Sequence, residues 1–365
     1  GCGFINTDRA TLTTGTPKFS ADGNITGFNI TQGNISIADN GLNANSTGLL
    51  RLLSRNLSLD GQVNVQQLEA VTGANAYDYT TGKATAIAGT GAAAQYAIDS
   101  TLLGGLYANR ISLISTEQGV GVRMANDAAT SAADFSLNAA DNIQLNNKIY
   151  AKQAINIQNA SAQQQKLNIQ GGLTANNISI GVANAQKLNV DVAGGTLYAD
   201  STLDLQSQAF SANNAKIQAK DALKVNANAD IALQNTVLDA ADLQVKSNAF
   251  NAQDSQLKSA QSINIQTAQD LKLKNTHAEV QNNIVLNAVN GNMELSGGKL
   301  KAGDALELKA NQLALSGQTS AANTNIQAQQ FTLDENGLIV SLNNTAVNDS
   351  NANVCGQMYS TAVNL

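Results

Sequence analysis

The sequence predicts an all-β solenoid in which three short strands form each coil of about 20 residues. Between Leu197 and Leu315, apolar residues recur in columns every 20 to 22 residues. Within each row apolar and polar residues alternate, as in Leu203-Asp204-Leu205, which is the pattern of a strand with one buried face. Together these observations favour a single-stranded parallel β-helix.

Three apolar columns and one polar column carry this prediction. The apolar columns are Leu203, Leu223, Leu243, Ile263, Ile284 and Leu306; then Leu197, Ile217, Val237, Leu257, Ala278 and Leu300; then Phe210, Ile231, Phe250, Leu271, Met293 and Leu313. The polar column is Asn214, Asn235, Asp254, Asn275, Gly297 and Gly317. We expect the polar column at corners, because Asn, Asp and Gly tolerate a left-handed backbone. A leucine-rich repeat has a similar period, but three strands per row leave no room for its helix.

Composition agrees with a thin β interior and narrows the possible partners. Aromatic residues make up 4% of the 365 residues, Trp is absent and Pro17 is the only proline. Charged residues make up 13%, and the formal net charge is −6. Nucleic-acid binding needs clustered Lys and Arg, so this balance argues against a nucleic-acid partner. No apolar run reaches the roughly 18 residues of a membrane-spanning helix.

The two cysteines, Cys2 and Cys355, are predicted not to be bonded to each other. If the chain were one continuous stack they would lie near opposite ends, whereas a disulfide needs Cα atoms within about 7 Å. We expect Cys2 to pair with a residue upstream of Gly1, and the chain to be a processed form or a fragment.

The chain divides into segments of different regularity. Residues 1–19 suit a strand and tight turns, and residues 20–68 read as coil units with variable corners, including Ile25, Phe28 and Ile30. Residues 71–96 predict an excursion from the coil, a loop or β-hairpin with Thr80 to Lys83 near its turn. Regular repeats run from 135 to 333, and 334–365 is expected to be an irregular tail or cap.

Three separated motifs resemble one family. They are Cys2-Gly-Phe-Ile-Asn-Thr7 followed by Leu12-Thr-Thr-Gly15, then Ile98-Asp-Ser100 with Leu103-Gly-Gly-Leu-Tyr-Ala108, and then Gly119-Val-Gly-Val-Arg123. These residues, in this order, resemble the two-partner secretion domain of filamentous haemagglutinin-like exoproteins. The similarity extends to the exoproteins of contact-dependent growth inhibition and to haemagglutinin-type adhesins.

The resemblance implies a right-handed parallel β-helix exported through an outer-membrane barrel partner and displayed on a Gram-negative cell. It assigns residues 1–134 to the secretion domain and 135–333 to haemagglutinin-type repeats. The family's Asn-Pro-Asn-Gly segment is missing, so we expect a secretion domain without its N-terminal cap. Toxin and receptor-binding parts of such exoproteins lie downstream.

The motif positions form two sets of candidate site residues. The secretion-motif candidates are Cys2, Gly3, Phe4, Ile5, Asn6 and Thr7. The other family-motif positions are Asp99, Ser100, Gly104, Gly105, Tyr107, Gly119, Gly121 and Arg123. Gly119 to Arg123 is not a phosphate loop, because it lacks the glycine spacing and the helix that such loops need.

Catalytic and metal sites are not predicted, and no cofactor is expected. His277 is the only histidine and has no His or Cys at metal-ligand spacing, so a surface position near a turn is the expected role. Asp200 and Asp221 fall in one turn column, which continues as Ala241 and Gln261, so a turn role outweighs a cation or acid–base site. Lys272, Lys274, Lys299, Lys301 and Lys309 predict a mild basic patch, read as a solvated surface that discourages lateral pairing.

The favoured function is a secretion module and rigid stalk of a surface exoprotein that serves adhesion or toxin delivery. Two alternatives belong to other classes. A carbohydrate-active β-helix enzyme would need a carboxylate cluster in a groove. A direct glycan-binding adhesin would need exposed aromatic residues, with Tyr77 and Tyr79 in the excursion as candidates for contact with a receptor or glycan.

Overall fold

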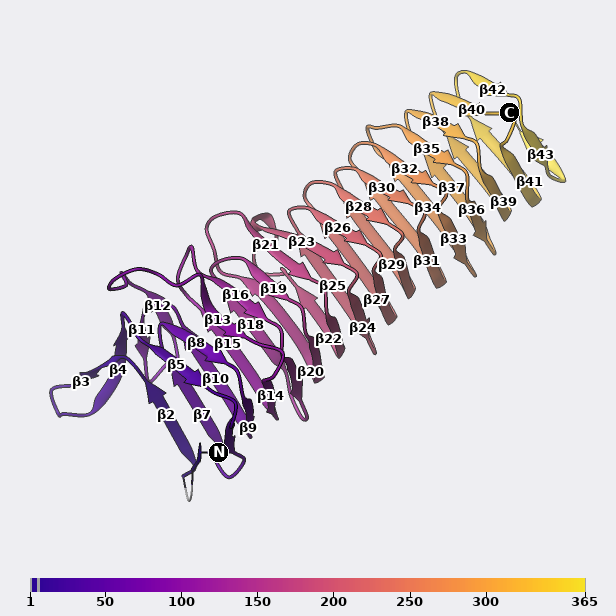
Figure 1. Ribbon diagram of the computed structural model, residues 1–365. Helices are drawn as coiled ribbons and strands as arrows, with labels where there is room; N and C mark the ends of the chain where they lie inside the picture. The colour runs from indigo at the N-terminus through magenta and orange to yellow at the C-terminus, as the bar shows by residue number, and fades with distance from the viewer. Residues whose placement is uncertain (1, 5–6, 365) are drawn as a thin grey trace. The chain divides into compact units, whose positions relative to one another are not determined.

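The computed structural model describes residues 2–4 and 7–364, and for Cys2 and Gly3 only the backbone. The chain divides into two compact units, Gly1–Asn189 and Val190–Leu365. In each unit short strands stack in parallel, coil upon coil (Figure 1). The predicted all-β solenoid with parallel coils is thereby confirmed. Within the described residues, no helix has the length and apolarity of a membrane span.

Each coil of the first unit has three faces, which we number in the order in which the chain visits them. Face 1 holds β1 (Cys2–Gly3), β6 (Leu42–Ala44), β9 (Gln62–Val65), β14 (Gly105–Ala108) and β17 (Asp127–Thr130). Face 2 holds β2 (Arg9–Thr13), β7 (Leu49–Leu53), β10 (Gln67–Thr72), β15 (Arg110–Ser115) and β18 (Phe135–Ala139). Face 3 holds β5 (Asn34–Ile37), β8 (Asn56–Leu59), β13 (Tyr96–Ser100), β16 (Gly121–Met124), β19 (Ile143–Leu145) and β21 (Gln165–Ile169). Two longer strands, β20 (Lys148–Asn159) and β22 (Gly172–Ile180), continue from face 1 into face 2, and the 3-10 helix η1 (Ala185–Lys187) follows them.

The second unit repeats the three faces. Face 1 holds β24 (Thr196–Ala199), β33 (His277–Val280), β36 (Lys299–Ala302) and β43 (Gln357–Tyr359), and face 2 holds β25 (Thr202–Ser207), β34 (Asn283–Ala288), β37 (Ala305–Lys309) and β44 (Ala362–Asn364). Strands that continue from face 1 into face 2 are β27 (Lys216–Ala227), β29 (Val237–Ser247), β31 (Gln256–Thr267), β39 (Gln318–Gln327) and β41 (Leu338–Asn348). Face 3 holds β23 (Leu188–Ala193), β26 (Phe210–Asn213), β28 (Ile231–Gln234), β30 (Phe250–Gln253), β32 (Leu271–Lys274), β35 (Met293–Ser296), β38 (Gln312–Leu315), β40 (Gln330–Leu333) and β42 (Ala352–Val354).

The predicted apolar columns are stacked, in-register pairs that fill the coil interior. Leu203 pairs with Leu223, and this column continues to Leu306 as predicted. The column that begins at Phe210 also holds throughout. In the column that begins at Leu197 one residue is wrong, because Ile217 pairs with Leu238 and Val237 pairs with Lys216. Leu238 is fully buried, whereas Val237 lies in the outward-facing row.

The polar column forms the corner between face 3 and face 1, as predicted. Asn214, Asn235, Asp254, Asn275 and Gly297 all have positive φ, between 47° and 64°. Each of the first four donates its backbone N–H to the corresponding strand end of the next coil, as Asn235 does to Gln253 at 3.1 Å. Gly297 must be a glycine, because a Cβ there would meet the Asn275 side-chain oxygen. Gly317, the last predicted member, is the second residue of its corner and does not share the positive φ.

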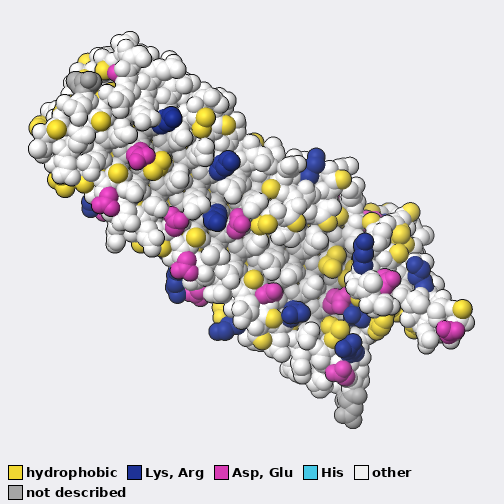
Figure 2. Space-filling model, turned by 180° about the vertical axis from the view of Figure 1, so that it is seen from behind, with side chains coloured by type: hydrophobic (Ala, Val, Ile, Leu, Met, Phe, Trp, Pro, Cys, Tyr) yellow, Lys and Arg dark blue, Asp and Glu magenta, His cyan; other side chains and the backbone are white. Residues whose placement is uncertain are grey.

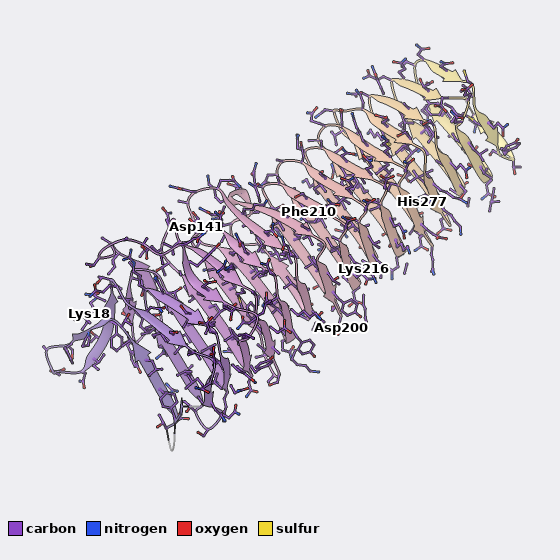
Figure 3. The ribbon with its side chains drawn as sticks, viewed as in Figure 1. Lys18, Asp141, Asp200, Phe210, Lys216 and His277 are labelled. Carbon is purple, nitrogen blue, oxygen red and sulfur yellow. The ribbon has the colours of Figure 1, made fainter. Side chains whose placement is uncertain are left out.

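Two β-hairpins leave the coils and form a separate antiparallel sheet. The predicted hairpin is present as β11 (Asn75–Asp78) and β12 (Ala84–Ala86). A second hairpin, β3 (Thr16–Phe19) and β4 (Ile25–Ile30), pairs with it through β4 and β11. The interpretation of Ile25, Phe28 and Ile30 as a coil was therefore wrong, since a hairpin strand has the same two-residue alternation as a coil strand. Lys18 lies on this projecting hairpin (Figure 3).

The hairpin sheet packs on face 2 of the coils through a small apolar core. Phe28, Ile30 and Tyr77 from the hairpins meet Leu53 and Val71 from β7 and β10. The backbones of β4 and β11 approach closely, because a Cβ at Gly27 would overlap the Tyr77 carbonyl oxygen. The hairpins are thus a docked part of the first unit.

Residues 334–364 continue the coils, whereas the sequence predicted an irregular tail or cap. β41 pairs in parallel with β39, and β43 and β44 pair with β41. The periodic signal weakens here because polar side chains, including Ser341 and Thr345, take interior positions and bond to each other at 2.8 Å. The strands β42 and β44 are exposed along their length.

The corrected column gives a direct stability test. Replacing Leu238 with Ala removes a fully buried side chain and should lower the free energy of unfolding by about 2–5 kcal/mol. Val237→Ala should cost less than half as much, because this side chain faces outward. Urea denaturation followed by circular dichroism checks both values, and equal losses would contradict the observed register.

The left-handed corners give a second test. Asn235→Ala should destabilise the protein by about 1–2 kcal/mol, because a Cβ-bearing residue without a locally bonding side chain disfavours positive φ. Asn235→Gly should be close to neutral, since glycine accepts this conformation. Asn251→Ala, on the exposed row of β30, is the matched control, and urea midpoints that fail to separate N235A from N235G would refute the corner argument.

Candidate functional site

Two of the sequence motifs meet on face 3 of the first unit. β13 and β16 pair in register, which places Asp99 beside Arg123. The guanidinium donates two hydrogen bonds to the carboxylate, at 2.8 and 2.9 Å, and lies over the Tyr96 ring at 4.5 Å from its centroid. The hydrogen bond to Asp99 raises the pKa of Arg123. Both side chains remain partly exposed, so this pair is a charged surface feature that joins two coils.

Other motif residues build the corner that follows β13. Ser100 is buried, and its hydroxyl oxygen accepts the backbone N–H groups of Ala125 at 2.8 Å and Asn126 at 3.3 Å. Gly104 lies against the preceding coil, where a Cβ would be 2.8 Å from the Leu59 carbonyl oxygen. Gly105 then begins β14. These three residues therefore fix how one coil turns over its neighbours.

The same corner carries exposed apolar residues. Leu102 and Leu103 are each 81% exposed at the tip of a four-residue turn. Tyr107, the next motif residue, lies on the outward row of β14, in register with Ala129 and then with Tyr150. Both tyrosines are exposed on face 1, on strands that are separated by β17, and the two leucines lie in the turn that leads into β14.

The third motif makes a turn that is tied to the next coil. Gly119 has a φ of 78° and donates its N–H to the Asp141 carboxylate at 2.7 Å. Gly121 begins β16, where a Cβ would lie 3.1 Å from the Asn142 carbonyl oxygen. The glycines therefore serve a tight turn and a close strand approach.

The N-terminal motif is partly described. The backbone of Cys2 and Gly3 forms β1, which pairs with β6. The Phe4 carbonyl oxygen accepts a hydrogen bond from Ser46 at 2.8 Å, and Thr7 is partly exposed. Ile5 and Asn6 lie outside the described residues. Cys355, in the second unit, is a free, exposed thiol.

A buried ion pair beneath the hairpin sheet has no counterpart in the sequence analysis. Arg55, 5% exposed, donates to both Glu117 carboxylate oxygens at 3.0 and 2.7 Å. It also donates to the Thr90 carbonyl at 2.7 Å, and Glu117 accepts the Ala74 N–H at 2.9 Å. Ala74 and Thr90 flank the β11–β12 hairpin, so the ion pair fastens both ends of the excursion. The two charges are 62 residues apart, and no spacing rule connects them.

A second cluster explains what the tyrosines of the excursion do. Arg51 donates to Glu69 at 3.0 Å, and the Tyr77 hydroxyl donates to the same carboxylate at 2.7 Å. The Arg51 guanidinium lies 5.0 Å from the centroid of the Tyr79 ring, which also makes an edge contact with Phe28. Burial and the bond to Glu69 raise the pKa of Tyr77. Tyr77 is only 1% exposed and so belongs to the core, while Tyr79 is 40% exposed.

The remaining polar candidates stay dispersed over the surface. His277 is exposed on β33, in register with Gln256 and Lys299. Asp200 pairs with Lys220 at 2.5 Å, and Asp221 accepts the Ser201 hydroxyl at 2.8 Å. Asp200 and His277 lie several coils apart (Figure 3). Within the described part of the chain, no group of three or more His, Cys, Asp or Glu could hold a metal ion.

The five lysines of the predicted basic patch are divided between faces. Lys272 and Lys274 lie on face 3, on β32, whereas Lys299 and Lys301 lie on face 1 and Lys309 ends β37 on face 2. Lys301 pairs with Glu279, which further dilutes the positive charge.

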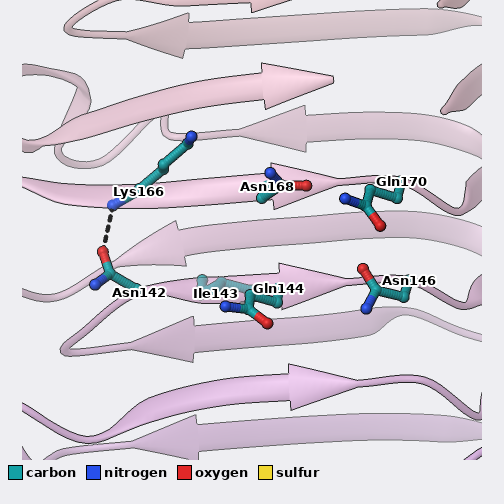
Figure 4. Close-up of a pocket in the computed structure, with 7 residues that line it drawn as sticks. All are labelled: Asn142, Ile143, Gln144, Asn146, Lys166, Asn168 and Gln170. Atoms are coloured by element: carbon teal, nitrogen blue, oxygen red, sulfur yellow. Dashed lines mark hydrogen bonds between the residues drawn. The ribbon is translucent and has the colours of Figure 1, made fainter. Parts of the chain in front are cut away.

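A shallow hollow of about 330 Å³ lies on face 3 over β19 and β21 (Figure 4). Amide side chains dominate its lining, which consists of Asn142, Ile143, Gln144, Asn146, Lys166, Asn168 and Gln170. Gln144 and Asn168 are in register, and the Lys166 backbone N–H donates to the Asn142 side chain at 2.7 Å. The lining has amides and one lysine but no carboxylate, so it does not provide the acid–base pair of a glycoside hydrolase.

The buried ion pair predicts a local, pH-dependent opening. Glu117→Gln should lower hydrogen-exchange protection at Ala74 and Thr90 by about tenfold or more, while Leu113 in the coil stays protected. The bond to Arg55 holds the pKa of Glu117 below its ordinary value of 4.5, so its contribution is present above that value and is lost as the pH falls. The difference in protection between parent and variant should therefore begin to shrink as the pH falls below 4.5, and it should disappear only below the lowered pKa of Glu117.

Asp22→Asn, in the exposed turn between β3 and β4, is the matched control for a lost carboxylate. If E117Q left both amides as protected as in the parent at neutral pH, the ion pair would not fasten the hairpin.

Comparison with known proteins identifies the first part of the chain. Residues 1–145 match the family model of the TPS secretion domain, where TPS stands for two-partner secretion. No solved structure gives a significant match.

Curated relatives extend the similarity beyond that domain. The chain is 48% identical over 139 residues to the tRNA nuclease CdiA-2 of Burkholderia pseudomallei, which covers 38% of this chain and 4% of that protein. It is 36% identical over 233 residues to the tRNA nuclease CdiA of Yersinia mollaretii, covering 64% of this chain and 7% of the relative. It is 32% identical over 334 residues to the 16S rRNA endonuclease CdiA of Enterobacter cloacae, covering 91% of this chain and 8% of the relative.

The chain therefore spans less than a tenth of the length of each of these relatives. Their nuclease names describe the long proteins, and the matched portion is the solenoid described above. The motifs at the start of the chain and the match over residues 1–145 agree: this part of the chain is a secretion domain of the two-partner secretion type.

Proposed function

We propose that the chain is the secretion module and β-helical stalk of a cell-surface exoprotein of the contact-dependent inhibition type. In this proposal residues 1–134, with the excursion at 71–96, form the secretion domain. Residues 135–333 form the haemagglutinin-type stalk, and the coils after 333 extend it. The match of residues 1–145 to the TPS secretion domain is the observation that carries the proposal.

The solenoid suits a chain that crosses a membrane unfolded and folds outside the cell. Each coil obtains its backbone hydrogen bonds from the coils on either side, so folding can propagate one coil at a time. Each added coil buries further apolar residues of the three columns, which supplies free energy without nucleotide hydrolysis. An outer-membrane barrel partner is therefore the transporter that we propose for this chain.

The motif side chains support a structural role in the secretion domain. Ser100, Gly104 and Gly119 shape corners, and Asp99 joins Arg123 across two coils. A role in scaffolding, rather than in a reaction, is what we propose for this segment. The nuclease names of the relatives support toxin delivery as the purpose of the stalk, with adhesion as the alternative.

Surface display on the source cells tests this function. Antibodies raised against residues 1–365 should label intact cells, and deleting the gene of the cognate barrel partner should abolish the label. An unrelated outer-membrane protein, detected with its own antibody, controls for cell integrity. Undiminished labelling after the deletion would overturn the proposed export route.

A further inference from the structure

Charged residues are sparse on the outside of the coils, and those that lie side by side on adjacent strands carry opposite charges. Most of the face seen in Figure 2 is uncharged, and several of its basic side chains lie beside acidic ones. Among the described strands of the second unit, five pairs of charged residues lie in register on adjacent strands. They are Asp204 with Lys224, Asp239 with Lys258, Lys258 with Glu279, Glu279 with Lys301, and Lys272 with Glu294. Each of these pairs joins opposite charges.

Four of these residues form one continuous row on face 1, which we call the charge ladder. It runs Asp239, Lys258, Glu279, Lys301 over four successive coils, one residue from each of β29, β31, β33 and β36. The sign alternates at every step. Lys301 and Glu279 are 2.7 Å apart, and Gln218 on the coil before Asp239 donates to its carboxylate at 3.0 Å.

The other rows of residues in the second unit do little to determine the order in which its coils stack. The interior columns present Leu, Ile or Phe in almost every coil, and these residues pack on one another in any order. The outward rows are rich in Asn and Gln, and an amide can bond to an amide from any coil. The corners repeat the same left-handed Asn or Asp. During folding, a coil could therefore pack on its second neighbour as well as on its first, while the coil between them stays looped out and unburied.

The charge ladder opposes this error. If the coil that contains Lys258 is looped out, Glu279 falls on Asp239. If the coil that contains Glu279 is looped out, Lys301 falls on Lys258. Because the sign alternates, each skipped coil exchanges attractive contacts for a like-charge contact, which is unfavourable between facing residues of adjacent strands.

We propose that the Asp239–Lys258–Glu279–Lys301 ladder sets coil order during folding, because skipping either of its two inner coils creates a like-charge contact. The ladder is a conformational device of this chain, and its action does not depend on the export route proposed above. Its contribution to native stability is small, since Lys258, Glu279 and Lys301 are exposed and Asp239 is partly exposed.

One pair of variants isolates the ladder. Glu279→Gln with Lys301→Gln removes both like-charge contacts that a skipped coil would create, and leaves the net charge unchanged. Glu307→Gln with Lys309→Gln is the matched control, because it also removes one acid and one base, from β37, where the in-register neighbours are uncharged. Both variants are made in the full 365-residue chain with Cys2→Ser and Cys355→Ser.

Engineered cysteines report a skipped coil. Val237→Cys with His277→Cys places the two thiols two coils apart. Two strand spacings of about 4.8 Å separate these positions by about 9.6 Å, which is too far for a disulfide in the native stack. If the intervening coil is looped out, the two positions become direct neighbours and can bond. Val237→Cys with Gln256→Cys is the positive control for native stacking.

The chain is refolded from urea at low salt under oxidising conditions, and the two-coil disulfide is quantified on non-reducing gels. We expect E279Q/K301Q to raise its yield by about two- to thirtyfold over the parent, and E307Q/K309Q to leave it unchanged. Sodium chloride at about 1 M should bring the parent close to E279Q/K301Q, because salt screens exposed charges. Equal yields in parent and E279Q/K301Q, including a yield at background in both, would overturn the proposal, as would an equal rise in E307Q/K309Q.

Discussion

The coil-to-coil backbone hydrogen bond is the interaction on which this structure depends. A single coil of three short strands has no partner for its own N–H and C=O groups, and it buries its apolar columns only against neighbouring coils. At each corner the same bond sets the geometry, as when Asn214 donates to Gln234 and Asn275 donates to Ser296 on the following coil. Strand pairing, corner conformation and interior packing therefore form together, each time a coil is added.

This dependence explains why the sequence predicted the second unit closely. The interior is narrow, so each coil contributes one apolar residue at each place in a column, and the period can be counted. The predicted column is wrong at Val237 because Val237 and Leu238 are both apolar and because this coil is one residue longer than the coil before it. Ile217 is followed 21 residues later by its true partner, Leu238, and the alternation alone could not choose between neighbours.

The features that the sequence did not reveal are tertiary ones. β3 and β4 alternate like coil strands, and only their antiparallel pairing with β11 shows that they have left the coil. Arg55 and Glu117 meet because two corners stack under the hairpin, and neither residue carries a local signal for the other. The sequence also could not predict that the motifs containing Asp99 and Arg123 lie side by side on neighbouring coils. The match of Asp99 to Arg123 depends on coil lengths that are irregular in this region.

Irregularity in chain length is confined largely to one place in the coil. Between faces 1 and 2 the long strands simply bend, and most corners from face 3 to face 1 consist of two residues. The connection from face 2 to face 3 varies most in length. The β3–β4 hairpin, the β11–β12 hairpin and the helix η1 are all inserted at this connection. Foreign peptides grafted at this connection, for example between Ala227 and Ile231, would be presented along one side of the solenoid without disturbing its pitch. The fold thus provides a display scaffold with a built-in row of permissive positions.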